Sequence, residues 1–233
     1  LQRRGARQVS STHLALLGGA AFGMSAGAAL IPLTRRQLAG AMARADVGHA
    51  EAAPRVAPWQ SIAVVLASGL LPGIVLHDVG WSIIAVPPLL LLIGLIQLAY
   101  CDASKRLLPK PLVWAITAAV IGSGIVIAGT QHEWDRLAIA AIGGTAFFVL
   151  LFAMNLLNPK WMAFGDVRLS LVVGFGLAWV SPFAVVEGFF IANALAAVIG
   201  VALIVAHRAE RRSALPFGFY LAIGAAITIL AWS

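Results

Sequence analysis

The sequence predicts an all-α integral membrane protein with about eight transmembrane helices, seven being the alternative. Of its 233 residues, 61% are hydrophobic and only 11% are charged, and the mean hydropathy is +0.95. A soluble domain needs more polar side chains than this to cover its surface. The apolar segments run without interruption for about 20 residues, whereas the strands of a membrane barrel alternate over about 10 residues.

The apolar segments give the order of the expected helices. They cover residues 13–33, 61–76, 81–100, 111–129, 137–157, 167–180, 183–206 and 216–232. The first follows a short basic stretch, and because it is long for the apolar part of a signal peptide we expect it to be retained. Pro87 and Pro88 are expected to kink the third helix.

A stripe of small residues marks the first helix and predicts close packing against a neighbouring helix. The stripe consists of Ala15, Gly19, Gly23 and Gly27. Residues 34–60 follow as the one substantial hydrophilic segment, which we interpret as a short cytoplasmic loop. Residues 1–60 are therefore expected to form a helix plus loop, and residues 61–233 the main helical membrane domain.

The net charge of +7 could suggest nucleic-acid binding, but the basic residues concentrate in short connections, as the positive-inside rule requires. No basic helix with interleaved aromatic residues supports binding to DNA or RNA. Connections 34–60, 101–110, 158–168 and 207–215 are therefore expected on the cytoplasmic side. The opposite connections carry a single cation, Arg136. Eight spans place the basic N-terminal residues outside, whereas seven spans would place them inside.

Three of the nine acidic residues lie at or within apolar segments: Asp102, Asp166 and Glu187. Asp102 ends the third expected helix and Asp166 begins the sixth, so both are expected at one membrane boundary. If these helices pack together, the two carboxylates can share one proton, because two like charges at close range cannot both ionise. Such a pair activates water: one carboxylate takes its proton and the other protonates a substrate carbonyl.

Other interpretations of these acids remain open. Asp166 could cap the helix that it begins, and Asp102 could be solvated beyond its helix. A proton relay that includes Glu187 would instead indicate a small transporter. The single cysteine, Cys101, excludes an internal disulfide, and the histidines lie too far apart to predict a metal site.

Three segments resemble the type IV prepilin peptidases, a family of membrane-embedded aspartyl proteases. Residues 163–169, Ala-Phe-Gly-Asp-Val-Arg-Leu, resemble the family's GxGD motif and contain Asp166. Asp102 is followed by Pro109 at the spacing of a second motif. Residues 215–225 begin Leu-Pro-Phe-Gly and resemble a third motif, with Pro216 and Gly218 at matching positions.

The resemblance implies an endopeptidase that removes the leader peptide of pilin, Tad pilin or pseudopilin precursors. It assigns the catalytic aspartates to Asp102 and Asp166 and the motif turn to Ala163 and Gly165. It also implies a multi-pass protein of the bacterial inner membrane, with the aspartates near the cytoplasmic face. No cofactor, no zinc and no nucleic acid are expected, and the oligomeric state stays open.

The sequence departs from the family pattern at three motif positions. Ala163 replaces the first glycine of GxGD, Lys110 follows Pro109 where the family often has Asp or Asn, and Phe219 replaces a proline. Residues 34–60 contain no cysteine, so we expect no methyltransferase activity. A catalytically inactive relative that binds pilins or assists their assembly is the alternative function.

Overall fold

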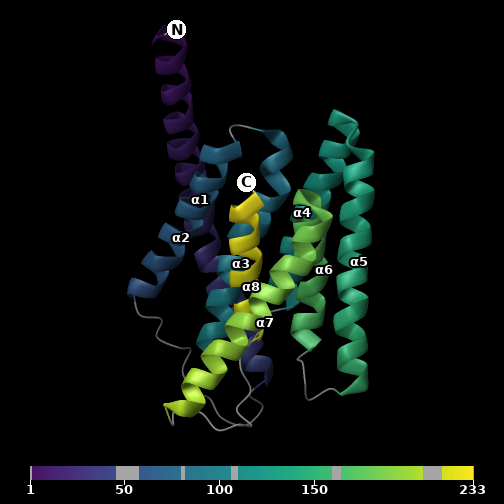
Figure 1. Cartoon of the computed structure of the whole chain (residues 1–233). Coiled ribbons are helices and arrows are strands. Elements are labelled where there is room, and N and C mark those ends of the chain that lie inside the picture. The colour runs from purple at the N-terminus through teal and green to yellow at the C-terminus, as the bar shows by residue number, and fades with distance from the viewer. Residues whose placement is uncertain are drawn as a thin grey trace.

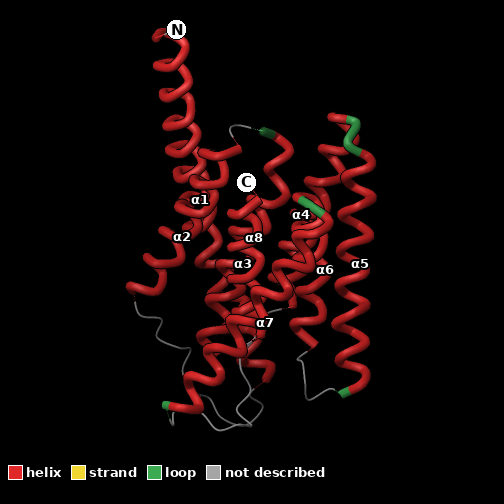
Figure 2. Tube along the Cα trace, viewed as in Figure 1, coloured by secondary structure: helices red, strands yellow, loops and turns green. Residues whose placement is uncertain are grey.

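The structure is a computed structural model that describes residues 2–45, 58–79, 82–105, 110–158, 164–206 and 217–232. All regular structure in these ranges is helical (Figure 2). The helices are α1 (Gln2–Ala45), α2 (Pro58–Val79), the 3-10 helix η1 (Ile83–Ala85), α3 (Val86–Lys105), α4 (Lys110–Gln131), α5 (Trp134–Leu157), α6 (Phe164–Val180), α7 (Pro182–Val205) and α8 (Phe217–Trp232).

Successive α-helices run in alternating directions through one bundle (Figure 1). The C-terminal ends of α1, α3, α5 and α7 therefore lie at the lower end of the picture, with the N-terminal ends of α4, α6 and α8. The N-terminal part of α1 extends beyond the other helices, and α7 lies obliquely across the bundle. This alternation brings the end of α3 and the start of α6 to one end of the molecule.

Helix α6 is the central helix of the bundle. It contacts α3, α4, α5, α7 and α8, and from Val172 to Trp179 each of its residues is buried. A helix that is apolar on all sides either lies in a protein core or faces lipid, and here neighbouring helices surround most of it. Trp179, the largest fully buried side chain among the described residues, lies near the C-terminal end of α6.

The small-residue stripe of α1 packs against α2, as the sequence predicts. A Cβ atom on Gly23 would lie 1.9 Å from the carbonyl oxygen of Ser68 on α2, so only glycine fits there. Gly19 and Gly27 also contact α2, through Leu76 and Ser68. Small residues at such contacts allow the two backbones to approach closely, which strengthens packing between membrane helices.

Two further helix pairs are joined in the same way. A Cβ atom on Gly174 of α6 would lie 2.9 Å from the carbonyl oxygen of Gly143 on α5. A Cβ atom on Gly224 of α8 would lie 2.6 Å from the carbonyl oxygen of Gly188 on α7. The pairs α5–α6 and α7–α8 are therefore held at short backbone separations on two sides of the bundle.

The predicted loop at residues 34–60 is wrong in its first part, because α1 continues to Ala45. Thr34 is buried, and its hydroxyl donates to Oε1 of Gln97 on α3 at 3.1 Å. The amide nitrogen of Gln97 also bonds to α1: Nε2 donates to the carbonyl oxygen of Gly27 at 3.4 Å. Arg35 and Arg36 lie where the apolar part of α1 ends, but the helix itself continues beyond them.

The predicted kink at Pro87 and Pro88 is also wrong. Both prolines lie in the first turn of α3, which begins at Val86 after η1. Backbone N–H groups in a first turn have no partner within the helix, so prolines there remove no hydrogen bond. The chain instead turns at Ser82, whose hydroxyl accepts a hydrogen bond from the backbone N–H of Ile84 at 3.3 Å.

Five segments of the described helices are long and apolar enough to cross a membrane: Leu16–Gln37, Ile83–Cys101, Lys110–Gln131, Trp134–Leu157 and Pro182–Val205. Ile62–Asp78 and Phe217–Trp232 are shorter apolar helices. The protein is a helical, multi-pass membrane protein. The count of eight crossings stays a prediction.

Apart from the aspartates Asp102 and Asp166 at the lower end and Arg136 at the upper end, several charged side chains distinguish the two ends of the bundle. The acidic side chains Asp78, Glu133 and Asp135 lie where α2 ends and α5 begins, at the upper end of Figure 1. The basic side chains Lys110 and Arg168 lie where α4 and α6 begin, at the lower end. We refer to these below as the acidic end and the basic end.

Candidate active site

Asp166 is a buried carboxylate in the first turn of α6, at the basic end. Its exposed fraction is 5%, and the residues that follow it, Val167, Leu169 and Ser170, are buried as well. Asp166 is the third residue of α6, so it lies inside the first turn of the helix and not at the N-cap position that precedes the helix. A carboxylate is favourable beside the positive end of a helix dipole, but burying one in an apolar bundle is costly and marks a functional candidate.

Aromatic residues cover the outer side of this turn. Phe164 is 44% exposed, and the guanidinium carbon of Arg168 lies 4.5 Å from the centre of its ring. The edge of the same ring meets Phe152 of α5, with 6.5 Å between ring centres. The cation–π contact holds Arg168 against the surface of α6.

Asp102 lies in the last turn of α3, also at the basic end; its side chain falls outside the described residues. The contact between Leu91 and Gly176 relates α3 to α6, because Leu91 fills the space that a side chain at Gly176 would occupy. Asp102 lies 11 residues after Leu91 and Asp166 lies 10 residues before Gly176. At about 1.5 Å per residue, both positions lie roughly 15 to 16 Å from that contact toward the basic end.

The register of α3 adds a second relation. Eleven residues make about three full turns of an α-helix, so Asp102 falls on the face of α3 that carries Leu91 and meets α6. The neighbouring residue Cys101 is buried, as expected for a small packing residue. The two aspartates therefore occupy corresponding levels of adjacent antiparallel helices.

Of the remaining motif residues, the structure describes two glycines. Gly165 is partly buried in the first turn of α6, and Gly218 is buried in the first turn of α8. Helix α8 contacts both α3 and α6, so the third motif begins at the same end as the aspartates. Ala163, Pro109 and Pro216 lie outside the described residues.

Most of the other described acids have partners at the acidic end. A carboxylate oxygen of Asp78 lies 2.8 Å from Nδ1 of His77. The carboxylate of Glu133 pairs with Nε of Arg136 at 3.3 Å. Glu187 lies in the second turn of α7 and bonds to the indole N–H of Trp232. A transmembrane proton relay requires acids near mid-membrane, and these side chains do not provide one.

Metal-binding clusters of three or more His, Cys, Asp or Glu side chains are absent from the described ranges.

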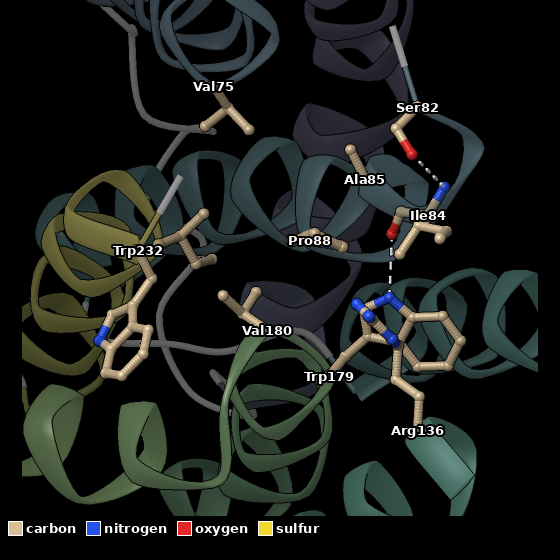
Figure 3. Close-up of a pocket in the computed structure, with 10 residues that line it drawn as sticks. Val75, Ser82, Ile84, Ala85, Pro88, Arg136, Trp179, Val180 and Trp232 are labelled. Carbon is tan, nitrogen blue, oxygen red and sulfur yellow. Dashed lines mark hydrogen bonds between the residues drawn. The ribbon is translucent and has the colours of Figure 1, made fainter. Parts of the chain in front are cut away.

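A cavity of about 290 Å³ lies at the acidic end, between η1, α2, α3, α5, α6 and α8 (Figure 3). Trp179 lines it, 13 residues beyond Asp166 on α6, which is about 20 Å along the helix. The cavity is thus separate from the aspartates. Sequence analysis did not identify it, although tryptophans at the ends of several apolar segments are the pattern of a membrane–water boundary.

Comparison with known proteins agrees with the motifs. Residues 89–205 match the type IV leader peptidase family. A protein named prepilin leader peptidase/N-methyltransferase from Stutzerimonas stutzeri is 31% identical over 173 residues, which cover 72% of this chain and 57% of the relative. Proteins of the same name from Aeromonas salmonicida and Pseudomonas aeruginosa are 30% and 29% identical, with 72% of this chain covered in both cases.

The chain spans little more than half the length of these curated relatives, 57%, 54% and 57% respectively. No solved structure matches it significantly.

Proposed function

Because this chain belongs to the type IV leader peptidase family, we propose that it is a membrane-embedded aspartic endopeptidase. Its substrates are prepilin-like precursors, and it hydrolyses the peptide bond between the leader and the remainder of the precursor. The relatives' name also includes an N-methyltransferase; our proposal concerns the peptidase step alone.

In this proposal water is the nucleophile and Asp102 and Asp166 share the proton transfers. One carboxylate takes a proton from water as it attacks the scissile carbonyl, and the other protonates the carbonyl oxygen. The first carboxyl then gives its proton to the amide nitrogen and the second takes the proton back from the hydroxyl as the C–N bond breaks, which releases the amine and the carboxylic acid. Gly165, next to Asp166 in the first turn of α6, leaves room for the substrate backbone because it has no side chain.

The observation that carries the proposal is the burial of Asp166, at 5% exposure, on a helix that is surrounded by other helices. A structural carboxylate at a helix start is ordinarily exposed to solvent, since burying its charge is unfavourable. The levels of Asp102 and Asp166 on α3 and α6 support a pair. The three motifs, in family order, support the same assignment.

We further propose that the basic end faces the cytoplasm and that the protein lies in the inner membrane. Lys110 and Arg168 lie at that end, in agreement with the positive-inside rule, which counts Lys and Arg rather than net charge. The aspartates would then meet a precursor at the cytoplasmic boundary, before its apolar segment has moved away from the membrane.

The test is cleavage of a prepilin co-expressed with the wild type, with Asp102→Asn or with Asp166→Asn, read as leader removal on a gel. Asparagine keeps the size of the side chain but cannot exchange a proton, so each variant is expected to lose cleavage by at least about a hundredfold. Asp135→Asn, an acid at the other end, is the matched control and is expected to cleave normally.

Cleavage by both aspartate variants at the wild-type rate would show that the catalytic assignment is wrong. A wild type that cleaves no prepilin encoded near its gene, while binding one, would instead support the inactive relative that assists pilin assembly. Membrane content of each variant, measured by immunoblot, separates lost catalysis from lost protein.

A further inference from the structure

The cavity at the acidic end lies where the spans meet the lipid headgroups. It is bounded by the last turns of α2, α6 and α8 and by the first turn of α5. Trp134 begins α5 and is 54% exposed there, and Trp232 is 45% exposed near the end of α8. Exposed tryptophans of this kind gather at the membrane–water boundary. A ligand of this cavity must therefore come from the boundary region.

Both tryptophans that line the cavity have their N–H groups engaged elsewhere. The indole N–H of Trp179 donates to the carbonyl oxygen of Ile84 at 2.9 Å, and that of Trp232 donates to Glu187. These bonds fix the two indoles, which lie on opposite sides of the cavity lining (Figure 3). Val75 and Val180 form an apolar wall with Trp232 on the left in Figure 3, and Ile229 also lines the cavity.

The opposite side of the cavity carries the polar groups. Arg136 uses Nε for Glu133, at 3.3 Å, and within the described part of the chain its two terminal nitrogens have no partner. A guanidinium has five N–H donors, so four remain. Ser82 lies on the same side in Figure 3; its oxygen accepts from Ile84, and its own O–H can still donate.

We propose that this cavity binds a phosphate-bearing amphiphile, with the phosphate on Arg136 and Ser82 and the apolar part against the wall that includes Trp232. A guanidinium matches phosphate oxygens in two-point contact. A cation would be repelled by Arg136, and a wholly apolar molecule would leave its donors desolvated and unpaired. At headgroup depth the shared chemistry of such a ligand is that of a membrane phospholipid, with free phosphate as the other source of the anion.

The test uses purified full-length protein in detergent and a phosphatidylethanolamine whose acyl chains carry bromine, which quenches nearby tryptophan fluorescence. We expect saturable quenching, part of whose amplitude is lost in Trp232→Phe. Brominated diacylglycerol, which has no phosphate, is expected to bind roughly tenfold or more weakly, since a hydrogen bond to a charged group is lost. Inorganic phosphate at equal concentration is expected not to displace the lipid.

Three variants locate the phosphate. Arg136→Gln is expected to weaken lipid binding roughly ten- to a hundredfold. Glu133→Gln is expected to strengthen it by up to about fivefold, because the competing carboxylate of an exposed pair is removed. Arg36→Gln, the same substitution at the opposite end of the bundle, is expected to leave the affinity unchanged.

The proposal is overturned if diacylglycerol binds as tightly as the phospholipid, or if Arg136→Gln binds normally. Weaker binding by Glu133→Gln would also overturn it, because that result would mean that the Glu133–Arg136 pair acts only on local structure. Displacement of the lipid by inorganic phosphate at the same concentration would also overturn the proposal, because it would mean that the cavity binds phosphate alone and makes no use of the acyl chains.

Discussion

The close contact between α1 and α2 at Gly23 predicts that adding a single methyl group there lowers the stability of the protein. In Gly23→Ala the new Cβ would lie 1.9 Å from the carbonyl oxygen of Ser68, 1.1 Å inside the 3.0 Å that real Cβ contacts respect, and 3.0 Å from the Cα of Gly69. These neighbours are backbone atoms, so no side-chain rotation relieves the overlap. The two helices must move apart along the whole contact.

The cost follows from that forced separation. Adding a methyl group to a tight contact costs about 1 to 3 kcal/mol, and for a chain of this size each kcal/mol lowers the melting temperature by roughly 2 to 4 °C. Gly23→Ala is therefore expected to lower Tm by several degrees, measured by intrinsic fluorescence in detergent.

Gly122→Ala in α4 is the matched control, because a Cβ there meets no atom within 4 Å. Alanine is also favoured over glycine inside a helix by about 1 kcal/mol, so this variant should melt at the wild-type temperature or slightly above it. If Gly23→Ala keeps a Tm within about 1 °C of the wild type, the backbone contact between α1 and α2 is not as close as the structure describes.

Three further predictions concern single contacts, each followed by the same melting assay. Gln97→Leu removes the buried acceptor of the Thr34 hydroxyl and should cost about 1 kcal/mol; the double variant with Thr34→Val should cost less than the sum of the two single changes, and additive costs would contradict the bond. Trp179→Phe leaves the carbonyl oxygen of Ile84 without its indole donor and should cost about 1 to 3 kcal/mol, while an unchanged Tm would show that this oxygen is already hydrated. Asp78→Asn breaks only an exposed pair and should change stability by less than about 1 kcal/mol; a larger loss would mean that Asp78 has a structural role.

The sequence was sufficient to predict the helical membrane fold, because about 20 consecutive apolar residues allow few alternatives. It also predicted that the stripe through Gly23 would face another helix. It could not show that the partner is α2, or that Ser68 lies opposite Gly23, because these depend on how two segments meet in space. The close backbone contact of Gly174 with α5 was missed for the same reason.

The two errors in the fold have a common cause. Arg35 and Arg36 were interpreted as the start of a loop, and Pro87 and Pro88 as a kink. A charged side chain indicates where a segment leaves the apolar layer of the membrane, but the helix can continue beyond that boundary. A proline lacks the backbone N–H group. It kinks a helix only where that group would donate within the helix, which is not the case in the first turn.

The candidate site was predictable in part. Motif spacing and alternating helix directions brought Asp102 and Asp166 to one end of the bundle from sequence alone. The burial of Asp166 was not predictable, since a residue at the start of an apolar run can equally face solvent. The cavity near Arg136 was also not predictable, because its lining comes from six separate helices.

The burial of α6 from Val172 to Trp179 has a consequence for how the sequence can change over time. On α5 and α7, where one side faces outward, a survey of all single substitutions should show tolerance that rises and falls about every 3.6 residues. Along α6 from Val172 to Trp179 no position faces outward, so the same survey should show uniform intolerance without a period. Change in α6 therefore requires compensating change in the helices around it, and this segment should drift more slowly than the rest of the chain.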